Sequence, residues 1–342
     1  MRQAIMTSPG KIELREAPKP EPGKGEVSIR IRRIGVCGSD IHVYHGLHPY
    51  TAYPVVQGHE VSGEIEALGK GVDGLIPGQP VTIMPQLTCG TCRPCKDGLY
   101  NICEKLRVFG FQAPGAAQDY FVISASMVIP LPKSLSVDSG ALIEPSAVAC
   151  HALRRGGGAK DKRITVIGAG PIGNLVCQCA KAQGAKEVLI SDPSDYRLSL
   201  ALECGADYIN NPSVQGLPEA TLERFGQDRA DLILECVGAE AGMDGALRSA
   251  RKGTTIVVVG VFGKKPLVDL GLVQDREISL VGTLMYRKED YLEAVELASR
   301  GTMKLDRLVT NYFPLEKYLD AYHFIEKTGD RAMKVLIDLD KE

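Results

Sequence analysis

The sequence predicts an α/β protein with two domains, one β-rich and one built around a parallel sheet. Its 342 residues suffice for about two domains of ~100–200 residues each, and a hydrophobic content of 44% can supply their cores. Up to residue 145, short β-branched runs are broken by glycine and proline, a pattern typical of antiparallel strands. From residue 146 onward, apolar strands alternate with helical stretches, which is the βαβ pattern of a parallel sheet.

Short strands are expected to make up most of the first domain. They are predicted at 27–34, 61–67, 81–84 and 118–122. The second domain is expected to begin with a strand, a helix, a strand and a helix. Three strands follow, and their near-continuous apolar runs suit a sheet that is covered on both faces. These elements are predicted at 164–168, 174–183, 188–192, 196–204, 231–237, 255–261 and 278–284.

The chain after residue 286 is predicted to leave the parallel sheet. Amphipathic helices are expected at 290–300 and 316–327, and a last strand, which could return to the first domain, at 334–339. We therefore predict a first domain of residues 1–145 and 287–342 and a second domain of residues 146–286.

The charge balance argues for a small neutral or weakly charged partner. With 40 Lys plus Arg against 42 Asp plus Glu, the net charge of -2 offers no basic surface for nucleic acid or an anionic membrane. No apolar stretch approaches the ~18 residues of a membrane span. Residues 1–10 lack the basic and apolar pattern of a targeting segment, so a cytoplasmic protein is expected.

Four cysteines in a short lobe, residues 86–106, predict a closed metal site. Their spacing is Cys89-x-x-Cys92-x-x-Cys95 followed by Cys103. Four thiolates so close in sequence can surround one zinc tetrahedrally and leave no position for water, so this zinc is expected to be structural. Disulfides are the alternative, which the absence of a secretory segment disfavours.

A glycine motif between a predicted strand and a predicted helix indicates a dinucleotide site. The strand at 164–168 runs directly into Gly168-x-Gly170-x-x-Gly173. The first glycine permits a tight turn, the second lets the backbone approach a pyrophosphate, and the third lets the helix pack closely on the strand. The helix N-terminus then points unpaired N–H groups at the phosphates. The residues expected to bind the cofactor here are Gly168, Gly170, Pro171, Ile172 and Gly173.

The end of the next strand carries an acidic residue that bears on cofactor choice. Asp192 follows Gly173 by nineteen residues, where a carboxylate would bind the adenosine ribose hydroxyls and repel a 2′-phosphate. This arrangement predicts a Rossmann domain that prefers NAD to NADP. Arg197 lies five residues further on, where it could face a phosphate or lie along the adenine edge.

A second set of metal ligands is spread along the sequence. It comprises Cys37, His59 with Glu60, and Glu144. A thiolate, an imidazole and a carboxylate leave one coordination position of zinc open to water or substrate, as catalytic zinc sites do.

These features together resemble the zinc-dependent medium-chain dehydrogenase/reductase family over essentially the whole chain. The segment Cys37-Gly38-Ser39-Asp40, the triplet Gly58-His59-Glu60, the four-cysteine lobe and the GAGPIG motif occur in that family's order. The resemblance implies a GroES-like catalytic domain and a Rossmann NAD-binding domain. It also implies two zinc ions per chain, one catalytic and one structural.

The segment Glu144-Pro145 resembles the polyol branch of this family, which includes sorbitol, L-idonate and butanediol dehydrogenases. This resemblance implies Cys37, His59 and Glu60 as zinc ligands and Glu144 as a ligand or a partner through water. It further implies that Ser39 and His42 relay a proton and that Asp40 orients the metal-bound histidine. Which of the two carboxylates touches zinc stays open.

The substrate implied by the polyol branch is a secondary alcohol of a polyol, inositol, aldonate or vicinal diol. Met285 stands where sorbitol dehydrogenases carry a substrate-facing arginine, which argues against sorbitol itself. One alternative is a threonine-dehydrogenase-like enzyme, and another is a non-catalytic NAD-binding zinc protein. A homotetramer or homodimer is expected, in which the strands at 255–261 and 278–284 extend a sheet across a two-fold axis.

Overall fold

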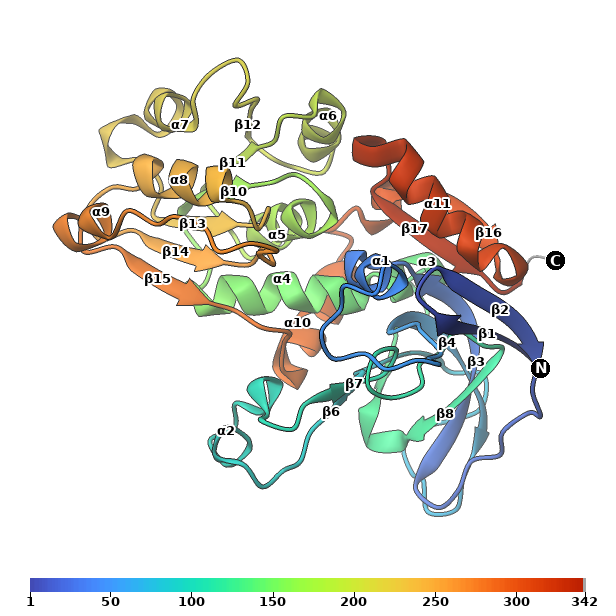
Figure 1. The fold of residues 1–342 in the computed structure, drawn as a ribbon. Helices are drawn as coiled ribbons and strands as arrows, with labels where there is room; N and C mark the ends of the chain where they lie inside the picture. The colour runs from blue at the N-terminus through green and yellow to red at the C-terminus, as the bar shows by residue number, and fades with distance from the viewer. Residues whose placement is uncertain (341–342) are drawn as a thin grey trace. The chain divides into compact units, whose positions relative to one another are not determined.

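The computed structural model describes residues 1–340 (Figure 1). The chain splits into two compact units: Met1–Glu144 with Leu308–Glu342, and Pro145–Arg307. Both predicted kinds of architecture are present, which confirms the α/β fold class.

The first unit contains a seven-stranded sheet that is mostly antiparallel. Its order is β16 (Val309–Pro314), β17 (Lys334–Asp338), β3 (Glu26–Gly35), β4 (Glu60–Leu68), β5 (Pro80–Ile83) and β9 (Val128–Pro130), with β8 (Tyr120–Ser124) also paired to β3. Alternate residues of β3, Val27, Ile29 and Ile31, are buried in the core. The strand near the C-terminus does return to this unit, because β17 pairs antiparallel with β3 and places Ile337 opposite Ile34.

Smaller elements complete the first unit. A hairpin is formed by β1 (Arg2–Ser8) and β2 (Lys11–Glu16), and a short pair by β6 (Gln86–Leu87) and β7 (Arg107–Val108). The helices are α1 (Gly38–Tyr44), α2 (Arg93–Lys96), α3 (Val137–Ala141) and α11 (Tyr318–Thr328). Short 3-10 turns are η1 (Tyr100–Ile102), η2 (Ala125–Met127), η5 (Leu315–Lys317) and η6 (Gly329–Arg331). The pair β6 and β7 closes the base of the lobe that holds α2 and η1.

The second unit is a six-stranded sheet in which every pairing is parallel. Its order is β12 (Tyr208–Asn210), β11 (Glu187–Ser191), β10 (Arg163–Ile167), β13 (Leu232–Glu235), β14 (Thr255–Val258) and β15 (Ser279–Gly282). This order, 3-2-1-4-5-6, is that of a dinucleotide-binding Rossmann sheet, whose topology reverses between β10 and β13. Ligands bind such sheets at the carboxyl ends of the strands beside that reversal.

Helices connect and cover the strands of this second sheet. They are α4 (Ile143–Arg155), α5 (Pro171–Ala182), α6 (Asp195–Glu203), α7 (Leu217–Phe225), α8 (Glu240–Ser249), α9 (Leu270–Asp275) and α10 (Lys288–Ser299), with 3-10 turns η3 (Gly226–Asp228) and η4 (Leu305–Leu308). Figure 1 shows α8 and α4 on opposite sides of the sheet. Helix α5 packs on β10 and β11, and α8 packs on β13.

The boundary near residue 287 differs from the predicted one. We predicted residues 287–342 as part of the first domain, but residues up to Arg307 group with the parallel sheet. The physical reason is a buried anchor on α10: Asp290 is 0% exposed. Its carboxylate oxygens lie 2.8 Å from Nδ1 of His151 and 2.6 Å from Nε of Arg154, both on α4. The amphipathic pattern predicted the helix, but its packing depends on partners that lie far away in the sequence.

The ion pairs around Asp290 also set its protonation. Burial by itself would raise the pKa of this carboxyl, but hydrogen bonds from His151, the Arg287 N–H and Arg154 hold the pKa below its usual value.

No helix formed by residues 1–340 is long and apolar enough to cross a membrane.

Candidate metal centres and cofactor site

The four cysteines of the lobe come together as predicted. The Sγ atoms of Cys89, Cys92, Cys95 and Cys103 all lie within 4.8 Å of one another. Cys92 is the N-cap of α2 and Cys95 lies in its only turn, while Cys103 ends η1. The distance from Cys92 Sγ to Cys103 Sγ is 3.8 Å. That separation fits a zinc tetrahedron with Zn–S bonds of ~2.3 Å, whose edges measure about 3.8 Å.

Backbone N–H groups of the lobe favour the thiolate form of Cys89 and Cys103, whereas burial raises the pKa of Cys95 to about 12. The N–H of Cys92 donates to Cys89 Sγ at 3.3 Å, and the N–H groups of Cys89 and Lys105 donate to Cys103 Sγ at 3.3 Å. Hydrogen bonds from Thr91, and then from the Cys92 N–H, lower the pKa of Cys89 to about 5. Four converging sulfurs with N–H groups aimed at two of them fit a structural zinc.

A second group of ligand atoms is formed by Cys37, His59 and Glu60, which also lie within 4.8 Å of one another. Cys37 is the N-cap of α1, and His59 directly precedes Glu60, the first residue of β4. The register of β3 and β4 sets Gly35 opposite Glu60. A Cβ atom at Gly35 would lie 2.2 Å from Glu60 Oε2, so this glycine makes room for the carboxylate.

The acid that was predicted to orient the histidine lies beside it. Asp40 is buried, and its Oδ2 accepts the Cys37 N–H at 2.9 Å. Asp40 Oδ1 lies 3.5 Å from His59 Nδ1, which has no hydrogen-bond partner. Because Nδ1 is turned toward Asp40, the ring nitrogen left to ligate a metal is Nε2. Burial alone would lower the pKa of His59, but Asp40 and Cys37 together raise it well above its usual value.

Asp40 accepts a hydrogen bond from Gln57, which in turn accepts one from Tyr322, and the sequence indicated neither contact. Gln57 donates from Nε2 to Asp40 Oδ1 at 3.2 Å, and the buried hydroxyl of Tyr322 donates to Gln57 Oε1 at 2.8 Å. Tyr322 lies on α11, so a helix near the end of the chain supports a ligand near its beginning. Nothing in the local sequence around Tyr322 signals this contact.

A lysine not identified from the sequence pairs with a predicted ligand. Lys334 on β17 places Nζ 2.6 Å from Oε2 and 2.9 Å from Oε1 of Glu60. Burial by itself would lower the pKa of Lys334, but Glu60, Cys37 and Glu144 raise it. In the sequence this lysine begins a short apolar strand, where it resembles an ordinary strand-edge residue.

The remaining predicted site residues are placed less closely. Ser39 Oγ donates to Cys37 Sγ at 3.1 Å. His42 is exposed on the last turn of α1. Glu144, buried in the first turn of α4, does not belong to the group of three ligands among residues 1–340, but it is near enough to affect Lys334. Its role at the metal stays a prediction.

The glycine motif has the geometry that a dinucleotide site needs. Gly168 has a φ of 95°, a conformation that L-residues rarely adopt. A Cβ atom at Gly173 would lie 1.8 Å from the carbonyl oxygen of Gly168, which only glycine avoids. Gly170 is the N-cap of α5, with Pro171 and Ile172 in its first turn. The N-cap position therefore carries no side chain of its own where a pyrophosphate would approach.

The acidic residue after β11 is tied to the glycine motif. Asp192 is buried and accepts the Ala169 N–H at 2.8 Å through Oδ2 and the Ser194 N–H at 2.9 Å through Oδ1. Arg197 Nη1 lies 4.0 Å from Asp192 Oδ2. Asp192 thus shapes the loop as well as presenting a negative charge beside it, a second role that the spacing did not reveal.

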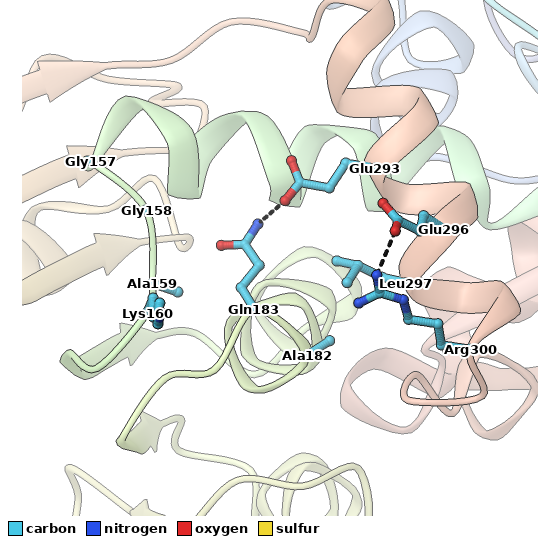
Figure 2. Close-up of a pocket in the computed structure, with 10 residues that line it drawn as sticks. All are labelled: Gly157, Gly158, Ala159, Lys160, Ala182, Gln183, Glu293, Glu296, Leu297 and Arg300. Carbon is cyan, nitrogen blue, oxygen red and sulfur yellow. Dashed lines mark hydrogen bonds and ion pairs between the residues drawn. The ribbon is translucent and has the colours of Figure 1, made fainter.

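A surface hollow of the second unit is separate from this site (Figure 2). It has a volume of about 420 Å³ and is lined by Gly157–Lys160, α5 residues and α10 residues. Its polar groups pair with each other: Gln183 with Glu293 at 2.8 Å and Arg300 with Glu296 at 2.5 Å. Because Gly157–Lys160 precede β10, the hollow lies at the amino ends of the strands, opposite the end where such sheets bind ligands.

The parallel sheet with its glycine motif and the two groups of metal-ligating side chains define the class of metal-dependent dehydrogenases. Family models agree with this class: residues 23–133 match the alcohol dehydrogenase GroES-like domain, and residues 171–300 match the zinc-binding dehydrogenase domain. The chain belongs to the zinc-binding dehydrogenase family. The resemblance stated from the sequence is thereby confirmed.

Relatives match over nearly their full lengths. The chain is 33% identical to 2-dehydro-3-deoxy-L-galactonate 5-dehydrogenase of Pseudoalteromonas atlantica, over 94% of each chain. It is 34% identical to human sorbitol dehydrogenase, over 98% of this chain and 95% of the relative. The crystal structure of galactitol-1-phosphate dehydrogenase from Escherichia coli superposes with a TM-score of 0.93 at 30% identity, covering 99% of this chain and 100% of that one.

Proposed function

We propose that the protein oxidises a secondary alcohol of a polyol, an aldonate or a related polyhydroxy compound to the ketone, with NAD as the hydride acceptor. The observation that carries this proposal is the group formed by Cys37, His59 and Glu60, a donor set that suits a catalytic zinc with an open position. Relatives named 2-dehydro-3-deoxy-L-galactonate 5-dehydrogenase and sorbitol dehydrogenase support the polyhydroxy class of substrate.

Zinc held by Cys37, His59 and a carboxylate from Glu60 or Glu144 would supply Lewis acidity that lowers the pKa of the substrate hydroxyl. The protein has to remove the proton thus released. Ser39, whose Oγ lies 3.1 Å from Cys37 Sγ, would accept it. The exposed imidazole of His42 would pass it to solvent.

The preference for NAD over NADP rests on Asp192. Its buried carboxylate would lie beside the ribose of the cofactor and repel a 2′-phosphate. The nearby guanidinium of Arg197 acts in the opposite direction. Similar structures have been solved with each cofactor, one with NADH at 30% identity and one with NADP at 28%. We therefore assign the preference to these two side chains of the chain itself.

An oligomer formed through β15 is part of the proposal. This strand is the edge of the parallel sheet, and Leu280 on it and Leu284 after it are exposed. An edge strand with exposed apolar side chains is suited to pair with its own copy across a two-fold axis. The homotetramer and the cytoplasmic location remain predictions, the latter because zinc-bound thiolates suit a reducing compartment.

The decisive experiment is NADH formation by the zinc-loaded protein with polyols, inositols, aldonates, vicinal diols and threonine, with NADP in parallel. A response to one polyhydroxy class with NAD is expected. A response to threonine alone would favour the amino-alcohol alternative. Binding of NAD and two zinc ions with no turnover of any compound would favour the non-catalytic alternative and overturn the proposal.

A further inference from the structure

Lys334 is buried at the second metal centre, where an unpaired positive charge would be costly. It is 3% exposed, and its Nζ contacts both carboxylate oxygens of Glu60, at 2.6 and 2.9 Å. The carbonyl of Val36 lies 3.4 Å from the same nitrogen. A buried ammonium persists only where such partners compensate for its lost hydration. Glu60 is thus the main partner of Lys334.

Glu60 can interact with two cations, the ammonium of Lys334 and a zinc ion at the second centre. It is one of the three groups whose ligand atoms converge within 4.8 Å, and it is 1% exposed. Both of its oxygens face Lys334. Gly35 provides the space for Oε2, since any Cβ atom there would lie 2.2 Å away. The backbone therefore accommodates the carboxylate in its lysine-paired position.

Acidic side chains and a cysteine surround Lys334 at this centre. Those that act on it are Glu60, Cys37 and Glu144, and Asp40 is buried nearby with its Oδ1 3.5 Å from His59 Nδ1. Without the metal, Lys334 stabilises Glu60; with the metal, the two cations repel each other and share this carboxylate.

We propose that Lys334 is a positioning residue that competes with the catalytic zinc for Glu60. It holds the carboxylate in place while the metal is absent, and it keeps Glu60 an exchangeable ligand once the metal is bound. This inference rests on the proposed function, because it requires zinc at Cys37, His59 and Glu60. A lysine that merely orients a ligand has the opposite consequence, since loss of such a support weakens metal binding by about 10–100-fold.

The test is Lys334→Met, measured as zinc affinity by competition with a chromophoric chelator. We expect zinc at the second centre to bind at least about ten-fold more tightly, the scale on which neighbouring groups change metal affinity. Affinity at the four-cysteine lobe is the internal reference and should not change. The thermal midpoint should fall in the metal-free protein and return close to the parent value when zinc is added.

Three further variants sharpen this test. Lys19→Met removes a lysine from an exposed pair with Glu66 in the same unit and should leave both zinc affinities unchanged. Lys334→Arg retains the charge and should restore parental affinity. In a Glu60→Gln background, Lys334→Met should change zinc affinity by less than about three-fold, because the two residues act as a coupled pair.

Unchanged or weaker zinc binding by Lys334→Met would overturn the inference. If this variant folds only with zinc, the release of zinc to excess chelator from the loaded protein replaces the titration. Slower release than from the parent is expected, and equal or faster release contradicts the inference. If the parent binds one zinc, at the four cysteines alone, the proposed function fails; if it binds two and the variant matches it, only the role of Lys334 fails.

Discussion

Replacing Asp40 by asparagine should weaken zinc at the second centre, whichever way the new amide is turned. If its NH₂ takes the place of Oδ2, it faces the Cys37 N–H, now 2.9 Å from an acceptor. If it takes the place of Oδ1, it faces the Gln57 amide, which lies 3.2 Å away, and His59 Nδ1. In each orientation a buried N–H loses its acceptor, which costs about 1–3 kcal/mol. One of the two ligands, Cys37 or His59, is left without its support.

The expected loss of zinc affinity is about 10–100-fold, which corresponds to about 1.4–2.7 kcal/mol. Rotation of the Gln57 amide would offset only part of it, because the hydrogen bond that the Tyr322 hydroxyl donates to Gln57 Oε1 at 2.8 Å would be lost. Chelator competition measures the affinity, and Asp97→Asn is the matched control, since Asp97 pairs with an exposed arginine of the lobe at 2.6 Å. A change of less than about two-fold for Asp40→Asn would refute the reasoning about its hydrogen bonds.

Three other substitutions test the cofactor site, the second unit and the lobe. Asp192→Gly should raise the ratio of kcat/KM for NADP to kcat/KM for NAD by about ten-fold or more. It should also raise KM for NAD, because the Ala169 N–H loses its acceptor. A ratio equal to that of the parent would contradict the role assigned to Asp192. Asp290→Asn should lower the free energy of unfolding by about 1–3 kcal/mol at pH 7, because Arg154 is partly exposed and keeps Glu293 as a partner, against under ~0.5 for the exposed Asp244→Asn. The pKa of Asp290 is lower in the fold than in the unfolded chain, so the stability that this carboxylate contributes is present above the unfolded pKa and is lost as pH falls through the folded pKa. The free energies of unfolding of the parent and of Asp290→Asn, measured by urea titration, should therefore converge in acid. Cys103→Ser should reduce bound zinc from two ions to one and loosen the lobe, seen as faster proteolysis, before it alters turnover.

The sequence predicted the strands of the parallel sheet, which are marked by apolar runs, but it did not predict the helix that begins in the segment containing Glu144 and Pro145. The apolar runs at 231–237, 255–261 and 278–284 became β13, β14 and β15. Helix α4 was not predicted, because the change of pattern put the domain boundary at residues 145 and 146, inside its first turn, where proline is tolerated. The domain boundary after β15 differs from the predicted one because the partners of Asp290 lie more than a hundred residues away in the sequence.

Spacing predicted those parts of the sites that are local in sequence. The four cysteines and the glycine motif each converge within a few turns of chain, so their geometry follows from their spacing. The approach of Cys37 to Glu60 depends instead on the register of β3 and β4, which no spacing encodes. Lys334 and Tyr322 reach the metal centre through tertiary packing alone, and a single sequence carries no signal for such contacts.

Asp40 and Lys334 should affect the second metal centre in opposite ways. Asp40→Asn is expected to weaken zinc binding, and Lys334→Met is expected to strengthen it. Asp40 accepts the Cys37 N–H and lies 3.5 Å from His59 Nδ1, so it would hold these two predicted ligands in place. Lys334 contacts both oxygens of Glu60, and the proposed competition would keep that carboxylate exchangeable. In the proposed zinc centre, Cys37 and His59 would then hold the metal while Glu60 would leave a coordination position available to substrate. If both substitutions weakened zinc binding equally, the buried lysine would be one more support of the site, and the exchange of Glu60 would have to be explained by Glu144 alone.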